Sequence, residues 1–309
     1  MNWDKYDFVW KAESFSNGEY RGAFAPTPIY DAENNRLFVY VTCVDSKYRG
    51  LPFCLELEPS DPRKIIEING PLLAHSGDGK FDSDGIMITS ILKTEKGYLF
   101  YYTGFARNED PPYVLSTGLA VSESLSTPMR RFSDKPVLQL SEEGTVVRSG
   151  LFVTKVGGQI VGWYAAGNDW KIINGNKSPR YDIFRIESKD GYEFGNQGER
   201  VLAAEDLVDC YAIGRPWVVV DEVAESFKMY LSKRRESLGK YRVGSALSKN
   251  GYDWIETTDE DELDVSENGF DNDVICYTSV IHVRRKKYIF FNGNGLGLTG
   301  FGIGIETKC

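Results

Sequence analysis

A repeat of roughly 62 residues runs through the chain and constrains its fold more than any other feature. Its clearest mark is a short aromatic run that recurs five times, as RLFVYVT, YLFYYTG, IVGWYAAG, FKMYLSK and YIFFNGN. Aligned on Tyr40, Tyr102, Tyr164, Tyr230 and Phe291, the copies lie 62, 62, 66 and 61 residues apart. Before each copy stand another apolar run and a short polar turn, as in GIMITSILK followed by TEKG, which is typical of a β-hairpin.

A second marker follows the hairpin. SKDGYEF at Ser188–Phe194 and SKNGYDW at Ser248–Trp254 lie 60 residues apart, and each comes after an alternating apolar run, YDIFRIE or YRVGSAL. GLAVSESLSTPMRRF is a degenerate copy, and FGIGIE near the end is a further run of this type. Each repeat therefore holds about four short strands.

Five repeats of four strands predict an all-β chain, a five-bladed β-propeller with four-stranded antiparallel blades that occupies residues 1–309 as a single domain. A blade cannot bury both of its faces alone, so packing against its neighbours completes the core. The last repeat lacks an outer strand after Ile305, and we expect the N-terminal run YDFVWKAE to supply it and to close the ring. Two stacked β-sandwich domains are the alternative, but they do not predict a fivefold repeat.

The stretch Gly295–Gly300 matches G-x-G-x-x-G, the pattern of a dinucleotide-binding turn. That turn needs a following helix whose N-terminus holds the pyrophosphate. Here nine residues, FGIGIETKC, follow, and they alternate as a strand does. We therefore interpret the glycines as a tight hairpin between the second and third strands of the fifth repeat.

The net charge of −9 and the pI near 5.0 argue against nucleic acid or an anionic membrane as partner. The N-terminal segment has neither the basic nor the apolar region of a secretory signal, and no apolar run is long enough to span a bilayer. The five cysteines are scattered without a metal-ligand spacing. We expect a cytoplasmic protein without a metal or another cofactor.

In a propeller the first strand of each blade lines a central funnel, so residues that begin these strands are expected to converge. Two D-x-D pairs, Asp82/Asp84 and Asp271/Asp273, stand at equivalent positions. Residues two apart on a strand face the same side, so each pair can present two carboxylates together. Paired carboxylates separate their pKa values and can provide an acid and a base. The predicted catalytic residues are Asp82, Asp84, Asp209 and Asp273.

Arginines and aromatic residues near the same strand ends are the candidates for ligand binding. An arginine there can bind a ligand carboxylate or phosphate, or else form Asp–Arg pairs that tie blades together. The acidic pairs can likewise be turn-forming residues. The predicted substrate-binding residues are Arg21, His75, Arg148, Tyr211, Arg215, Arg234, Asp271 and Tyr277.

Over nearly its whole length the chain resembles the five-bladed propellers of glycoside hydrolase families 43 and 32. The motifs that carry the resemblance are SKDGYEF, SKNGYDW, FDSDGIMITSI at 81–91 and FFNGNGLGLTGFG. They look closest to a branch that resembles the family 32 N-terminal domain and often accompanies glycan biosynthesis genes. The resemblance implies a carbohydrate-active protein.

The carboxylates that the resemblance implies are not all in place. The family has an acid on the first strand of blade one, where this chain has Ala25-Pro-Thr-Pro28. Arg148-Ser-Gly150 stands in place of Arg-Asp-Pro, and Asp209-Cys210 in place of Glu-Cys. Either the aspartates of this chain form another acid–base set or hydrolysis has been lost.

We therefore carry three hypotheses. The first is a glycoside hydrolase-like enzyme that acts on a sugar or sugar conjugate, with Asp82 or Asp84 facing Asp209 or Asp273 across the funnel. The second is a non-catalytic propeller that binds a glycan or a nucleotide sugar. The third is an interaction scaffold with broad exposed apolar patches. In the first two, the partner is a small molecule or an oligosaccharide; the sequence does not predict an oligomeric state.

Overall fold

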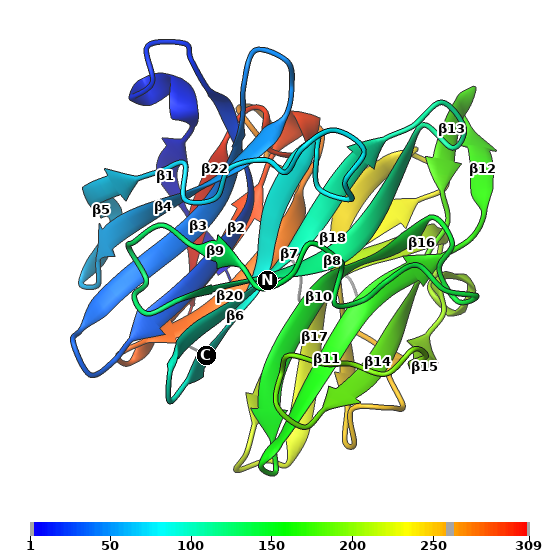
Figure 1. Ribbon diagram of the computed structural model, residues 1–309. Helices are drawn as coiled ribbons and strands as arrows, with labels where there is room; N and C mark the ends of the chain where they lie inside the picture. Colours follow the sequence, from blue (N-terminus) through cyan, green and yellow to red (C-terminus); the bar gives the residue numbers. More distant parts are fainter. Residues whose placement is uncertain (1–2, 258–262, 308–309) are drawn as a thin grey trace.

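The computed structural model describes residues 3–257 and 263–307, and these residues form an all-β structure (Figure 1). The strand pairings fall into five antiparallel units of four strands each. Three short 3₁₀ helices are described, η1 (Ala12–Ser14), η2 (Ala204–Asp206) and η4 (Asn294–Gly297). Among the described residues, no helix is long and apolar enough to cross a bilayer.

The first two units follow the chain order. Unit one consists of β2 (Arg21–Asp31), β3 (Arg36–Val44), β4 (Gly50–Glu58) and β5 (Asp61–Asn69). Unit two consists of β6 (Gly85–Thr94), β7 (Gly97–Arg107), β8 (Tyr113–Ser122) and the short β9 (Arg130–Arg131).

The remaining units repeat this order with two variations. Unit three consists of β10 (Val147–Val156), β11 (Gln159–Gly167), β14 (Asp182–Ser188) and β15 (Glu199–Leu202), with a hairpin of β12 (Trp170–Ile173) and β13 (Asn176–Pro179) inserted after β11. Unit four consists of β16 (Cys210–Asp221), β17 (Ser226–Arg235), β18 (Lys240–Ser248) and β19 (Ile255–Glu256). Unit five consists of β20 (Cys276–Val283), β21 (Lys286–Asn292), β22 (Phe301–Glu306) and, from the other end of the chain, β1 (Trp3–Trp10), which pairs with β22.

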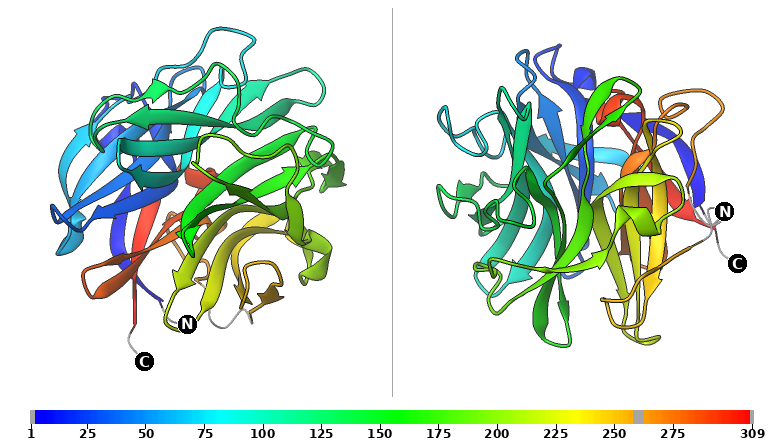
Figure 2. Two further views of the ribbon diagram at one scale, coloured as in Figure 1. Left: turned by 60° about the horizontal axis from the view of Figure 1, so that its bottom comes forward. Right: turned by 90° about the vertical axis from the view of Figure 1, so that its right-hand side faces the viewer.

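The first strands of the units contact one another in a cycle. β2 contacts β6, β6 contacts β10, β10 contacts β16, β16 contacts β20, and β20 contacts β2. The left view of Figure 2 shows the units following one another around a centre in the order of the chain, so that the first and last units lie side by side.

The five aromatic residues that define the repeat form the core between the units. Tyr40, Tyr102, Tyr164, Tyr230 and Phe291 lie on the second strands and are all buried. Burying an aromatic side chain contributes about 1.5–3 kcal/mol, so this register of the repeat is strongly favoured.

Specific contacts join neighbouring units. The ring of Tyr40 meets that of Phe100 edge to face, with centroids 5.2 Å apart, between units one and two. Trp217 of unit four packs against Phe152 of unit three and donates its indole N–H to the Val280 carbonyl of unit five over 2.7 Å.

The glycine-rich stretch lies in the turn between β21 and β22, which confirms its interpretation as a hairpin. Gly297 and Gly300 have φ angles of 123° and 109°, which L side chains rarely adopt. A Cβ atom on Gly297 would lie 2.8 Å from the Cα atom of Phe24. The glycines thus allow the turn to pack closely against unit one.

Candidate functional site

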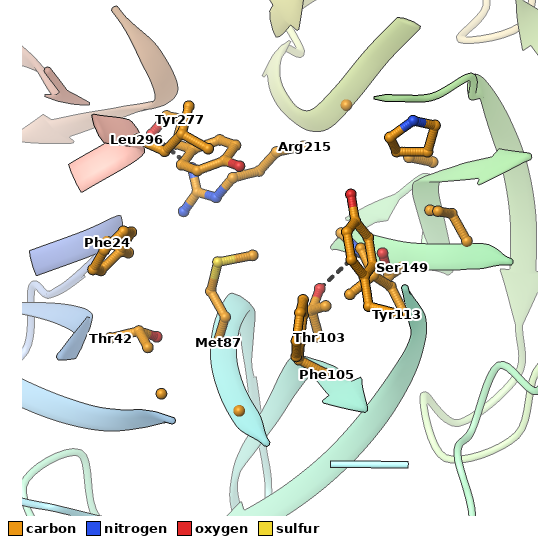
Figure 3. A pocket seen from close by; sticks show the side chains of 18 of the residues that line it. Phe24, Thr42, Met87, Thr103, Phe105, Tyr113, Ser149, Arg215, Tyr277 and Leu296 are labelled. Carbon is orange, nitrogen blue, oxygen red and sulfur yellow. Dashed lines mark hydrogen bonds between the residues drawn. The ribbon is translucent and has the colours of Figure 1, made fainter. Parts of the chain in front are cut away.

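A cavity of about 410 Å³ lies where the five units meet, and every unit contributes to its wall. Figure 3 shows Met87 pointing into it, with Phe24 and Thr42 on one side and Tyr113 and Ser149 on the other. Because residues far apart in the sequence converge here, this cavity is the candidate site.

Three tyrosines at the start of third strands form much of the aromatic wall: Tyr113 of unit two, Tyr181 of unit three and Tyr241 of unit four. The ring of Phe105 stacks on that of Tyr113, with centroids 5.1 Å apart, and the hydroxyl groups of Tyr181 and Tyr241 share a hydrogen bond. Flat aromatic faces held in this way suit the apolar faces of a sugar ring.

Our sequence analysis missed these tyrosines, although their signal was present. Tyr181 and Tyr241 are the first letters of YDIFRIE and YRVGSAL, which lie 60 residues apart. Both runs are expected strands, but the predicted site residues lie at the entries of the first strands of the repeats.

The charged residues of the cavity wall are three arginines and one aspartate. Arg107, Arg215 and Arg234 line it, and Asp84 is the one carboxylate among its described lining residues. Asp84 accepts hydrogen bonds from the backbone N–H of Arg107 and from the Ser83 hydroxyl, each over 3.0 Å. Of the predicted site residues, Asp84, Arg215, Arg234 and Tyr277 line this cavity.

Arg215 lines the cavity, and both terminal nitrogens of its guanidinium are hydrogen-bonded, whereas its buried Nε has no partner among the described residues. Its guanidinium donates to the carbonyls of Tyr277, Thr278, Ala25 and Pro26 over 2.9–3.2 Å and to the Thr27 hydroxyl over 2.7 Å. Burial lowers the pKa of Arg215 to about 10, which still leaves it charged at neutral pH.

The backbone around Arg215 is strained in a repeated manner. Ala25, Arg215 and Tyr277 have φ angles of 52°, 48° and 53°, and Gly150 has 70° at the matching place in unit three. Left-handed φ angles in non-glycine residues cost about 1–3 kcal/mol each and cluster at functional sites. Ala25 is buried and bonded to Arg215 through its carbonyl, and the described cavity lining includes no carboxylate from β2, the strand on which the resemblance places one.

The expectation that each D-x-D pair presents two carboxylates together is wrong. Both pairs lie in turns before β6 and β20, so the alternation of a strand does not apply to them. Asp82 is fully buried, and its carboxylate is 2.8 Å from Nε of Arg131 on β9, the outer strand of the same unit. Asp84, two residues on, faces the cavity.

The second pair repeats this arrangement. Asp271 is buried, and its carboxylate is 2.5 Å from Nζ of Lys5 on β1, the outer strand of unit five. Asp273 is exposed and pairs with Lys240. In both units the first aspartate therefore ties a turn to the outer strand, and Asp82, Asp271 and Asp273 all lie outside the described cavity lining.

Asp209 also lies outside this lining, directly before β16, where its carboxylate caps the turn between β17 and β18. Its carboxylate accepts hydrogen bonds from the hydroxyl and backbone N–H of Ser237 and from Nε of Arg235. These interactions, the Ser237 hydroxyl first, lower the pKa of Asp209 to about 2, whereas a general acid needs a raised pKa.

This lowered pKa predicts a dependence of stability on pH. The folded state binds the Asp209 proton less tightly than the unfolded state, whose pKa is near 3.8, so the stabilisation is present above about pH 4 and is lost as the pH falls toward 2. We expect Asp209→Asn to lower the free energy of unfolding at pH 6 by less than about 1 kcal/mol, because solvent screens the group. In urea unfolding, the difference in free energy of unfolding between the parent and Asp209→Asn should be smaller at pH 3 than at pH 6. An equal difference at both pH values would contradict the assignment.

The other predicted binding residues are not part of the described cavity lining. Arg148 is buried and pairs with Glu143 over 2.7 Å, at a separate shallow hollow of unit three. Nε2 of His75 lies 3.1 Å from the Gly50 carbonyl oxygen, and desolvation lowers the pKa of His75. Arg21 stacks on Tyr48, a residue of the cavity wall, and Tyr211 is buried behind Arg234.

Among residues 3–257 and 263–307, no group of three or more His, Cys, Asp or Glu side chains is placed to hold a metal ion. The described wall instead combines aromatic faces, guanidinium groups and a single carboxylate. That arrangement can hold a ring-shaped polar ligand.

No model of a known protein family matches the sequence. Among curated proteins, "Uncharacterized protein Rv1502" of Mycobacterium tuberculosis strain H37Rv is 32% identical over 243 residues, which cover 78% of each chain. "Uncharacterized protein MT1551" of M. tuberculosis strain CDC 1551 matches to the same extent.

Solved structures show the same fold at low identity. A chain described as "Glycoside hydrolase" superposes with a TM-score of 0.74 at 16% identity, covering 98% of this chain and 91% of the other. A thermostable family-43 glycoside hydrolase gives 0.68 at 17% identity, covering 92% and 88%. An endo-arabinase from Bacteroides thetaiotaomicron gives 0.65 at 12% identity, covering 98% of each chain. The resemblance to family 43 five-bladed propellers is therefore confirmed in the structure.

Proposed function

This chain belongs to the same family as the M. tuberculosis protein Rv1502, and for it we propose a carbohydrate-binding function in which a sugar occupies the central cavity without being hydrolysed. The observation that carries the proposal is the composition of the cavity wall. Aromatic residues line it from every unit, whereas its described lining holds one carboxylate, Asp84.

We also infer that the five units form a closed five-bladed ring. The cyclic contacts of β2, β6, β10, β16 and β20 support this inference, as does the pairing of β1 with β22. In such a ring the cavity is the axial funnel, and its wall is held by all five units at once. A rigid wall of this kind favours binding because little ordering is needed when the ligand enters.

Hydrolysis by two carboxylates requires a pair of acids about 5–9.5 Å apart on either side of the bond. Asp82 and Asp209 are engaged in buried or turn-capping interactions outside the cavity, and Asp273 pairs with a surface lysine. The distant structural match to glycoside hydrolases favours hydrolysis as a second candidate, with Asp84 as its acid.

A cavity-filling substitution tests the binding function whichever sugar is bound. Met87 points into the cavity from β6 and is half-buried (Figure 3). We expect Met87→Trp to place an indole in the cavity and to weaken sugar binding by about tenfold or more, with little change in thermal stability because the side chain enters open space. Saturation-transfer NMR with a panel of mono- and oligosaccharides measures the binding.

The matched control is His282→Trp, which places the same indole on β20 at an exposed position outside the cavity lining. Equal binding by the parent, Met87→Trp and the control would contradict a cavity site. Mass spectrometry of the same mixtures tests the second candidate: product that forms with the parent and disappears in Asp84→Asn would favour hydrolysis over binding alone.

A further inference from the structure

The guanidinium of Arg234 is partly buried and, like that of Arg215, has no acid beside it among the described residues. Within the described residues, Arg131, Arg148 and Arg235 each have a carboxylate within 3 Å, namely Asp82, Glu143 and Asp209. Among the described residues, no carboxylate lies within 4.0 Å of the Arg234 guanidinium, the distance limit for an ion pair. The buried Nε of Arg234 has no hydrogen-bond partner among these residues.

Tyrosine side chains surround this guanidinium instead. Its central carbon lies 4.6 Å from the ring centre of Tyr241 and 5.9 and 6.0 Å from those of Tyr181 and Tyr211. Burial raises the pKa of Tyr113 to about 12 even though the neighbouring Arg234 charge opposes the rise, so the Tyr113 hydroxyl is neutral at physiological pH. These contacts hold the cation in place, but none of them supplies a negative charge, and a partly desolvated cation without one is costly.

The net charge of the cavity wall also favours an anionic ligand. Its described wall carries three arginines and one aspartate, 3 − 1 = +2, although the protein as a whole carries −9. Asp84 is already bonded to the Arg107 backbone, and its carboxylate is 3.7 Å from the Arg107 guanidinium. Arg215 is already bonded to five acceptors. Arg234 is therefore the cation of this wall that is left for a ligand.

We propose, building on the cavity's role as a sugar site, that the ligand carries a carboxylate or phosphate group which Arg234 binds. A guanidinium presents parallel N–H donors whose spacing matches two oxygens of either group. The tyrosine cage lowers the local dielectric, so the pairing is stronger than it would be at the surface. The ligand class is an acidic sugar, such as a uronic acid or a sugar phosphate.

The test uses Arg234→Met, which keeps much of the length of the side chain and removes its charge. The control is Arg200→Met, which removes the same charge from a side chain that is 55% exposed and outside the described cavity lining. Calorimetry measures binding of inorganic phosphate and of acetate, and then of glucose 1-phosphate, glucuronate and glucose. The two acidic sugars distinguish a phosphate ligand from a carboxylate ligand.

We expect one of the two anions to bind the parent and the Arg200→Met variant, and to bind Arg234→Met at least about tenfold more weakly. Without ligand, Arg234→Met should melt at the same temperature as the parent or higher, because the substitution removes a buried charge that has no acid partner. A lower melting temperature with unchanged anion binding would mean that Arg234 is structural and would overturn the proposal.

Failure of the anion site and failure of the sugar site give different results. Glucose bound by the parent and by Arg234→Met alike, with no preference for acidic sugars, would overturn the anion site and leave the proposed function standing. Phosphate bound only when Arg234 is present, with no sugar bound at all, would support the anion site and count against the sugar function. No binding of either anion to the parent would overturn the proposal.

Discussion

Replacing Arg215 with methionine is expected to destabilise the protein by about 3 kcal/mol or more. Its guanidinium donates hydrogen bonds to the carbonyls of Ala25 and Pro26 on β2 and to those of Tyr277 and Thr278 on β20. The carbonyls of Ala25 and Pro26 also accept hydrogen bonds from the Thr27 and Ser279 hydroxyls, so those of Tyr277 and Thr278 are the two that lose their side-chain donor. Each buried acceptor that is left unsatisfied costs about 1–3 kcal/mol.

The reason for this dependence lies in the bulges of the first strands. The ladder between β2 and β3 shifts register between Phe24 and Thr27, and that between β20 and β21 shifts between Cys276 and Ser279. A bulge leaves backbone groups unpaired. Arg215, from the bulge of β16, supplies donors to the bulges of β20 and β2 and so joins units four, five and one.

Urea unfolding followed by tryptophan fluorescence measures the effect. Arg180→Met is the matched control: Arg180 pairs with Glu205 at the surface, and its loss should cost less than about 1 kcal/mol. A free energy of unfolding for Arg215→Met within about 1 kcal/mol of the parent value would contradict the structural role of Arg215. Arg215→Met and Arg234→Met are thus expected to differ in stability. The Arg215 guanidinium donates to four backbone carbonyls, whereas that of Arg234 is surrounded by tyrosine rings.

The repeat made the fold predictable because both its signals are local. Alternating apolar runs and polar turns mark strands and hairpins wherever they stand, and the aligned aromatic residues, from Tyr40 to Phe291, are all buried in the structure. The outer strand of the last unit was also predicted, as the N-terminal run YDFVWKAE, and in the structure β1 pairs with β22.

The site was harder to predict because its residues are not at the positions that the repeat emphasises. The prediction assumed that Asp82 and Asp84 face the same side, as residues two apart on a strand do. They lie in a turn, where this alternation does not hold. A better signal was the distance to the core tyrosine: Asp82 stands 20 residues before Tyr102, and Glu143 stands 21 before Tyr164, and each acid accepts a hydrogen bond from that hydroxyl. An acid at this repeated spacing belongs to the framework of its unit.

Asp82→Ala is therefore expected to lower the free energy of unfolding by about 3–5 kcal/mol, the usual cost of removing one partner of a buried ion pair. The carboxylate accepts hydrogen bonds from Nε of Arg131 over 2.8 Å, from the buried hydroxyl of Tyr102 over 3.0 Å and from the Ser76 hydroxyl. Its removal leaves these donors without an acceptor and releases β9 from the turn. Burial and the Asp82 charge both raise the pKa of Tyr102, so this hydroxyl stays protonated and continues to need an acceptor.

Asp84→Ala is the matched control, two residues away in the same turn. Asp84 is partly exposed to the cavity, and we expect its loss to cost less than about 1 kcal/mol while it alters ligand binding. Chemical unfolding of the two variants, together with sugar binding, separates the roles. If Asp82→Ala unfolds like the parent but no longer binds sugar, Asp82 belongs to the site and its assignment to the framework is wrong. If it unfolds far more easily and Asp84→Ala does not, only the second acid of the pair belongs to the site.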